Sequence, residues 1–210
     1  MVNIETQKLK CGAVLFEEFE LLDVFGPLEM FGLLRDRVEI VMLGMQTGAV
    51  RSAQGPRAWV DATLGESPPL DILLIPGGWG TRRGVEDPVL IEALKRLSEN
   101  AAWVATVCTG TALLARTGLL NDRKATSNKL AFKWVMSQGP AVHWVPEARW
   151  VEDGKFFTAS GVSAGMDMAL GLVDKIFGHE TALQVARHAE YIWNDDPTRD
   201  PFAKLSGLVG

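Results

Sequence analysis

Short apolar runs alternate with helical patterns along the chain. Apolar runs of this length are typical of strands buried on both faces, and such strands are predicted at 10–16, 38–43, 70–75 and 101–107. Apolar positions with helical spacing predict helices at 23–34, 87–99, 109–117, 130–137, 162–177 and 180–192. Strands separated by helices indicate an α/β fold, doubly wound, with a mostly parallel sheet and helices on both faces.

Other stretches give weaker signals. Two or three short strands are expected within 142–160, and residues 194–201 are expected to be irregular. Pro27 is expected in the first turn of the helix at 23–34, because proline is tolerated there and breaks a helix interior. Asp167 lies in the first turns of the helix at 162–177, where its negative charge interacts well with the helix dipole, so a structural role is expected.

Composition favours one soluble domain. The chain has 210 residues, of which 47% are hydrophobic and 22% charged, and we expect a single domain spanning 1–210. The net charge is −5, from 21 basic and 26 acidic residues. The basic pairs Arg82-Arg83 and Arg123-Lys124 are too short for a phosphate-binding surface, so nucleic acid is not expected as a partner.

Two sequence features bear on location. No uninterrupted apolar stretch is long enough for a membrane span, and the N-terminus does not resemble a signal peptide. There are two cysteines, too few for a disulfide framework in a domain of this size. We therefore expect a cytoplasmic protein with no membrane partner.

Cys108 is the candidate chemical centre. It follows the apolar strand at 101–107, and Thr109-Gly110 opens a helix at once, which is the pattern of a strand–nucleophile–helix elbow. Such a turn exposes the side chain at the sheet edge, and the helix N-terminus favours a thiolate. The alternative is a small buried hydrophobe that ends a strand, and this interpretation is preferred for Cys11.

Two further segments follow predicted strands. Asp23 is either an ordinary helix N-cap or a carboxyl group that acts with Cys108. A carboxyl group beside a thiolate has its pKa raised by the like charge and can donate a proton at neutral pH. Gly77 and Gly78, followed by Trp79, can turn backbone N–H groups toward a developing negative charge, although glycines also simply make turns.

Ordered motifs along most of the chain resemble the DJ-1/ThiJ/PfpI superfamily. They are Leu22-Asp23-Val24-Phe25-Gly26-Pro27, Ile75-Pro76-Gly77-Gly78, Val107-Cys108-Thr109-Gly110, Gly118-Leu119-Leu120, Lys124-Ala125-Thr126, the segment 160–170 and Pro201-Phe202. The resemblance implies a flavodoxin-like fold, Cys108 as nucleophile or sensor and Asp23 as its carboxyl partner. It also implies a homodimer.

The motifs are most similar to the isonitrile (isocyanide) hydratase branch, and equally to the ligand domains of AraC-type regulators. Those regulators add a helix-turn-helix domain, which we do not find in these residues. The protease branch has a histidine directly after the cysteine, where this chain has Thr109. Relatives have a histidine in the segment matching Thr126-Ser127-Asn128, and Asn128 cannot act as a base. His143, His179 and His188 lie elsewhere.

The resemblance implies hydration of an isonitrile, a small electrophile, to an N-substituted formamide. Cys108 would add to the carbon, Asp23 would serve as acid and base, and Thr109 and Gly78 would position them. Gly77, Trp79 and Asn128 are further expected contacts of the substrate, with no cofactor and no metal. The alternatives are a cysteine-based redox sensor, a glyoxalase- or deglycase-like enzyme of carbonyl stress, and a binding module without turnover.

Overall fold

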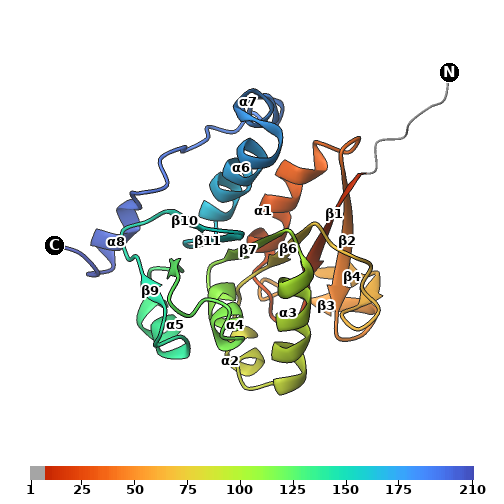
Figure 1. Ribbon diagram of the computed structural model, residues 1–210, viewed down its shortest axis with the longest axis horizontal. Helices are drawn as coiled ribbons and strands as arrows, with labels where there is room; N and C mark the ends of the chain where they lie inside the picture. The colour runs from red at the N-terminus through yellow and green to blue at the C-terminus, as the bar shows by residue number, and fades with distance from the viewer. Residues whose placement is uncertain (1–7) are drawn as a thin grey trace.

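A seven-stranded sheet forms the centre of the protein, whose computed structural model describes residues 8–210 (Figure 1). The strand order is β10-β11-β7-β6-β1-β2-β5; the β10–β11 pair is antiparallel and the other neighbours are parallel. The strands are β1 (Leu9–Val14), β2 (Val38–Gly44), β5 (Ala62–Thr63), β6 (Ile72–Ile75), β7 (Trp103–Val107), β10 (Trp150–Asp153) and β11 (Phe156–Ala159).

Helices cover both faces of this sheet (Figure 1). One face carries α1 (Leu21–Gly32), α6 (Ala164–Phe177) and α7 (His179–His188). The other carries α3 (Pro88–Asn100), α4 (Gly110–Arg116) and α5 (Phe132–Gln138), with the short α2 (Thr81–Gly84) beside α4. A separate apolar core lies on each side. The predicted doubly wound, flavodoxin-like arrangement is therefore confirmed.

Smaller elements lie outside this frame. An antiparallel hairpin joins β3 (Gly48–Arg51) to β4 (Arg57–Val60), and a parallel pair joins β8 (Lys124–Ala125) to β9 (His143–Trp144). A last helix, α8 (Pro201–Leu205), begins with Asp200 as N-cap. Within residues 8–210, no helix is long and apolar enough to cross a membrane.

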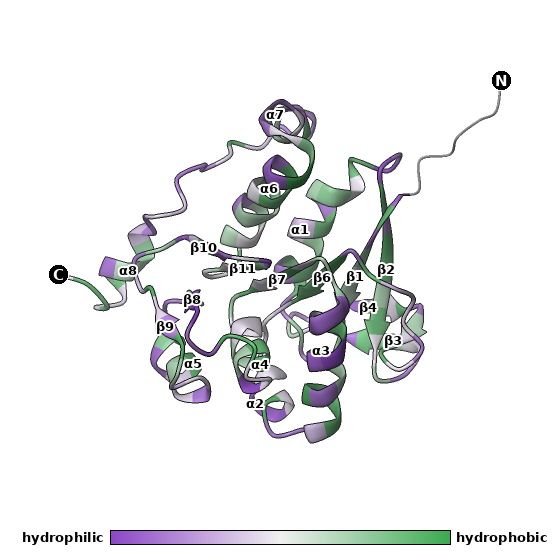
Figure 2. Cartoon of the chain, viewed as in Figure 1, coloured by the Kyte–Doolittle hydropathy of each residue, from purple (hydrophilic) through white to green (hydrophobic). Residues whose placement is uncertain are grey.

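Hydropathy explains the layers. Figure 2 shows hydrophobic central strands, whereas α3 alternates hydrophobic and hydrophilic residues. The four residues of β6 are all buried, as expected for a strand covered on both faces. Helix α3 buries Leu90, Leu94 and Leu97 along one stripe and begins at an Asp87 N-cap that accepts two backbone N–H bonds.

The prediction for Pro27 is wrong. Helix α1 begins at Leu21, so Pro27 lies inside the helix and not in its first turn. Proline has no N–H, so the Asp23 carbonyl receives no intrahelical bond from it. Packing of α1 against α6 and the sheet holds this segment helical, because the buried apolar residues Val24, Leu28 and Phe31 lie on the packed side.

Candidate active site

Cys108 occupies the sharp turn between β7 and α4. Its φ is 56°, a left-handed conformation that is uncommon for a residue other than glycine. Its N–H donates to the Ser160 carbonyl at 2.8 Å, and its carbonyl accepts from Ser127 Oγ at 2.6 Å. A Cβ added to Gly110 would overlap the Ile75 carbonyl oxygen, so only glycine lets α4 start this close to β6. The predicted elbow is present.

Asp23 projects from α1 and is fully buried beside the cysteine. The Gly77 N–H donates to its Oδ2 at 2.9 Å, and its Oδ1 has no hydrogen-bond partner among residues 8–210. Burial raises the pKa of Asp23 to about 8; the Gly77 bond lowers it, the charge of Glu20 raises it, and the Cys108 contact lowers it. Asp23 therefore carries a proton at neutral pH.

The surroundings of the Cys108 sulfur include groups that raise the pKa of the thiol and groups that lower it. Burial raises the pKa of the thiol, and the negative charge of Asp23 raises it further. The backbone N–H groups of Thr109 and Val162 and the side-chain amide of Asn128 lower it by hydrogen bonding. The raising effects are the larger, so the net pKa of the thiol lies above its usual value. Two adjacent negative charges are also disfavoured, so the Asp23–Cys108 pair carries at most one negative charge.

Thr109 links the cysteine elbow to the loop that contains Gly77 and Gly78. Its hydroxyl accepts from the Gly78 N–H at 3.1 Å and from Thr81 Oγ1 at 3.0 Å, while its own N–H faces the sulfur. The Gly78 N–H, expected to contact substrate, is therefore bonded to Thr109. The Gly77 N–H, expected there too, is the group that holds Asp23.

A cavity of about 360 Å³ opens onto the sulfur. Trp79, which is 68% exposed, and Asn128 form part of its wall, so both lie where a substrate at Cys108 would pass. Asn128 Oδ1 accepts from the Ala131 N–H at 3.0 Å, which fixes the orientation of its amide. The full lining is Glu20, Gly78, Trp79, Arg82, Cys108, Thr109, Asn128, Leu130, Ala131 and Val162.

Comparison with known proteins identifies the family. The model of the DJ-1/PfpI family matches residues 10–175. The chain belongs to the DJ-1/PfpI family. It is 32% identical over 184 residues to an isonitrile hydratase of Pseudomonas putida, a match that covers 87% of this chain and 78% of that protein. A crystal structure of a ThiJ/PfpI family protein from Pseudomonas syringae has a TM-score of 0.82 and 26% identity, covering 96% of this chain and 85% of that one.

The DJ-1/PfpI family is functionally mixed. The chain is also 26% identical over 166 residues to the glutathione-independent glyoxalase DJR-1.2 of Caenorhabditis elegans, covering 78% of this chain and 84% of that protein. The family model and these relatives identify the fold, and the reaction must be argued from the site.

Sequence reasoning missed Arg82. In the sequence it is half of a short basic pair with Arg83, yet in the structure it lines the cavity. Its guanidinium carbon lies 4.0 Å from the ring centre of Trp134 and 5.2 Å from that of Trp79. Burial lowers the pKa of Arg82, and the charge of Cys108 raises it. The spacing between Trp79 and Arg82 was the available signal, but Trp134 is remote in sequence.

The remaining ionisable candidates lie away from the cavity. Within residues 8–210, none of the histidines is part of its lining: His143 is in β9, His179 pairs with Asp174 at 3.0 Å, and His188 ends α7. Cys11 is fully buried in β1, and burial raises the pKa of its thiol to about 12, in agreement with the core interpretation. A cysteine–histidine protease site is therefore not assembled among these residues.

Proposed function

We propose that the protein hydrates an isonitrile to an N-substituted formamide. The observation that carries the proposal is a buried carboxyl group beside an elbow cysteine, with its pKa raised to about 8 by burial and with no histidine in the cavity lining of the described residues. Protonation of carbon needs an acid at neutral pH, and Asp23, with a pKa of about 8, supplies one. Similarity to an isonitrile hydratase supports the same reaction.

The first step forms a covalent bond. The negatively charged Cys108 sulfur adds to the terminal carbon of R–N≡C, and that carbon takes the proton of Asp23. The product is a thioimidate, Cys108–S–CH=N–R, beside an Asp23 carboxylate. The N–H groups that lower the pKa of the thiol hold the sulfur at the cavity floor before it reacts.

The second step releases the product. The Asp23 carboxylate takes a proton from water, whose oxygen bonds to the thioimidate carbon. The C–S bond then breaks, the sulfur regains its negative charge, and the hydroxyl proton moves to nitrogen to give R–NH–CHO. Asp23 ends the cycle protonated, so one water is consumed and no cofactor is needed in this scheme.

Turnover of cyclohexyl isocyanide tests the proposal. We expect the wild type to produce the formamide, Cys108→Ser to produce none, and Cys11→Ala, the matched control in the core, to retain the reaction. Formamide is measured by liquid chromatography, and intact mass shows that Cys108 is reduced. Wild-type protein that is reduced and folded yet forms no formamide would refute the proposal.

A second candidate is a redox sensor, favoured by the hydrogen-bond donors around the sulfur. A sulfinate at Cys108 would accept from the same N–H groups and from protonated Asp23. Peroxide treatment followed by intact mass tests it: a stable gain of two oxygen atoms at Cys108, without isonitrile turnover, would favour this function. A glyoxalase-like activity is tested by methylglyoxal consumption with the same variants.

We further propose a homodimer that acts in the cytoplasm. The support is the resemblance to the superfamily together with an apolar exposed surface on α1, where Leu22 and Phe25 are 39% and 44% exposed. Exposed apolar side chains grouped on one helix are a feature of protein interfaces. Light scattering of the purified chain measures its mass, and a monomer at micromolar concentration would contradict the dimer.

A further inference from the structure

Two cavities meet beside Cys108. The first is the 360 Å³ cavity that contains the sulfur, and the second has a volume of about 290 Å³. They share the lining residues Asn128, Leu130 and Val162, so the two cavities are neighbours. A group bound at Cys108 that is longer than the first cavity would therefore extend past Leu130 toward the second.

The second cavity has an apolar outer wall supplied by α8. Phe202 and Leu205 of that helix line it, and they are 53% and 79% exposed. Leu130, on the ridge between the cavities, is 91% exposed. Large apolar side chains gathered around one hollow mark a ligand or partner surface. Because this hollow joins the reactive cavity, the occupant we assign is a part of the same small molecule.

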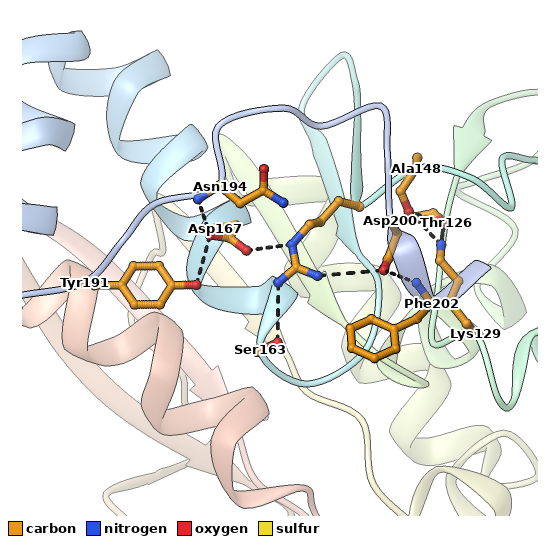
Figure 3. Close-up of polar contacts among 10 residues, drawn as sticks. Thr126, Lys129, Ala148, Ser163, Asp167, Tyr191, Asn194, Asp200 and Phe202 are labelled. Atoms are coloured by element: carbon orange, nitrogen blue, oxygen red, sulfur yellow. Dashed lines mark hydrogen bonds and ion pairs between the residues drawn. The ribbon is translucent and has the colours of Figure 1, made fainter. Parts of the chain in front are cut away.

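Two buried ion pairs of Arg149 hold this wall in place. The Arg149 guanidinium donates to Asp167 Oδ2 at 2.7 Å, and its Nη1 lies 3.9 Å from Asp200 Oδ1. Asp200 caps α8 by accepting the Phe202 N–H at 3.0 Å. Figure 3 shows Asp167, Ser163 and Asp200 around one guanidinium, with the Phe202 ring attached to the capped end. The wall is therefore preorganised, because the residue that starts α8 is tied to α6 through buried charges.

One polar group in the second cavity is unsatisfied. Ser160 lines it, and the Ser160 hydroxyl is buried with no hydrogen-bond partner among the described residues. Lys129 also lines it, but its ammonium already donates to Thr126 Oγ1 at 2.8 Å and to the Ala148 carbonyl at 2.6 Å. A buried hydroxyl without a partner is uncommon, but Ser160 has no exposed surface, so a molecule in the second cavity cannot reach this hydroxyl. The apolar wall therefore remains the feature that selects an occupant.

We propose that the second cavity is a specificity subsite for the substituent of the molecule that reacts at Cys108. The substituent is an elongated aliphatic or aryl group that crosses Leu130 and packs on Phe202 and Leu205. The inference deepens the proposed hydration, where R of R–N≡C is this group. The length preference itself requires only that Cys108 reacts with an electrophile.

Alkylation of Cys108 tests the subsite without any hydratase activity. The probes are N-alkyl iodoacetamides from methyl to octyl, and the readout is the second-order rate of labelling at Cys108, located by peptide mass spectrometry. In the wild type we expect the rate to rise by about tenfold or more along the series, since each buried methylene favours binding. In Phe202→Ala/Leu205→Ala the rise should be lost, with a deficit that grows with chain length.

Ile192→Ala is the matched control. Ile192 belongs to the same C-terminal segment and is 92% exposed, but it lines neither cavity. This variant should keep the wild-type length dependence. Because Phe202 and Leu205 are exposed, their double variant should fold, which circular dichroism checks.

Several results would overturn the subsite. A flat length dependence in the wild type would show that no substituent reaches the wall from Cys108. No labelling at any length would remove the reactive cysteine on which the subsite depends. An unchanged length dependence in the double variant, with a lower mass by light scattering, would assign the wall to a second copy of the chain. Length-dependent labelling without isonitrile turnover would instead keep the subsite and remove the hydratase proposal.

Discussion

Replacing Asp23 by asparagine should stabilise the protein while abolishing the proposed chemistry. A carboxyl group has a pKa near 3.9 in an unfolded chain, and burial raises that of Asp23 to about 8 in the folded state. The folded protein therefore binds a proton that the unfolded chain releases between about pH 4 and pH 8. The stability that this proton supports is complete below pH 4 and is lost as the pH rises through 8.

The size of the effect on stability follows from the difference between the pKa of Asp23 in the folded protein and in the unfolded chain. Each pH unit is equivalent to about 1.4 kcal/mol, so at pH 7 the carboxyl destabilises the fold by about 4 kcal/mol relative to a neutral isostere. The amide that Asp23→Asn introduces keeps an oxygen to accept from the Gly77 N–H. Its new donor group costs about 1–3 kcal/mol if it finds a poor partner. The net expectation at pH 7 is a gain of about 1–3 kcal/mol in the free energy of unfolding.

Urea unfolding at pH 5, 6, 7 and 8 separates titration from packing. The cost of the amide does not change with pH, so the advantage of Asp23→Asn over wild type should grow by about 2–3 kcal/mol between pH 5 and pH 7. Asp36→Asn, at an exposed carboxyl, is the control and should show little change. A difference between Asp23→Asn and wild type that is constant with pH would refute the assignment of a buried, protonated Asp23.

Three further variants test other parts of the site. Gly77→Ala should lower isonitrile turnover at least about tenfold, because its Cβ would lie 2.6 Å from the Thr109 nitrogen. Arg82→Gln should slow iodoacetamide labelling of the nucleophile roughly threefold to tenfold, through loss of a nearby positive charge. Arg149→Met should lower the free energy of unfolding by about 3–5 kcal/mol in urea, because it leaves the buried Asp167 carboxylate without its cation.

Each variant has a control at a second residue of the same type. Gly32→Ala places a Cβ 3.5 Å from Ile40, an ordinary contact, and should keep turnover. Arg83→Gln removes a charge that is largely exposed, so labelling should match the wild type. Equal labelling rates in the two arginine variants would contradict the role of Arg82. Arg123→Met, at a half-exposed ion pair, should cost less than about 1 kcal/mol.

The strands and the elbow could be predicted because their signals are local. The residues on either side of Cys108, an apolar strand before it and a small-residue helix after it, are enough to predict the turn. The carboxyl ends of parallel strands lie at one edge of the sheet, which places the other candidate segments near that turn. The same rule made Asp23 a candidate beside the cysteine, and the resemblance to the superfamily favoured that pairing over an ordinary N-cap. The hairpin at β3–β4 was not predicted, since each of its strands has only four residues, too few for an alternating pattern to stand out in the sequence.

The features of the site that could not be predicted depend on contacts between residues that are far apart in the sequence. Nothing near Arg82 indicates that Trp134 will cover it, and the pairing of Arg149 with Asp167 and Asp200 joins three separate elements. Asp167 was expected to have a structural role through the helix dipole, whereas its charge is in fact met by a buried guanidinium. Pro27 was misplaced because local propensity favours a first-turn proline and tertiary packing overrode it.

The position of β1 in the sheet has a consequence for synthesis. Among residues 8–210, the first strand along the chain is an interior strand, with β2 on one side and β6 on the other. Until residues 72–75 leave the ribosome, a nascent chain with β1 and β2 presents an apolar edge with unpaired backbone groups. The Cys108 turn can form only later in synthesis, because the Cys108 N–H donates to the carbonyl of Ser160. Premature termination or slow translation in this interval therefore produces a chain without the nucleophile turn but with a sheet edge that invites aggregation.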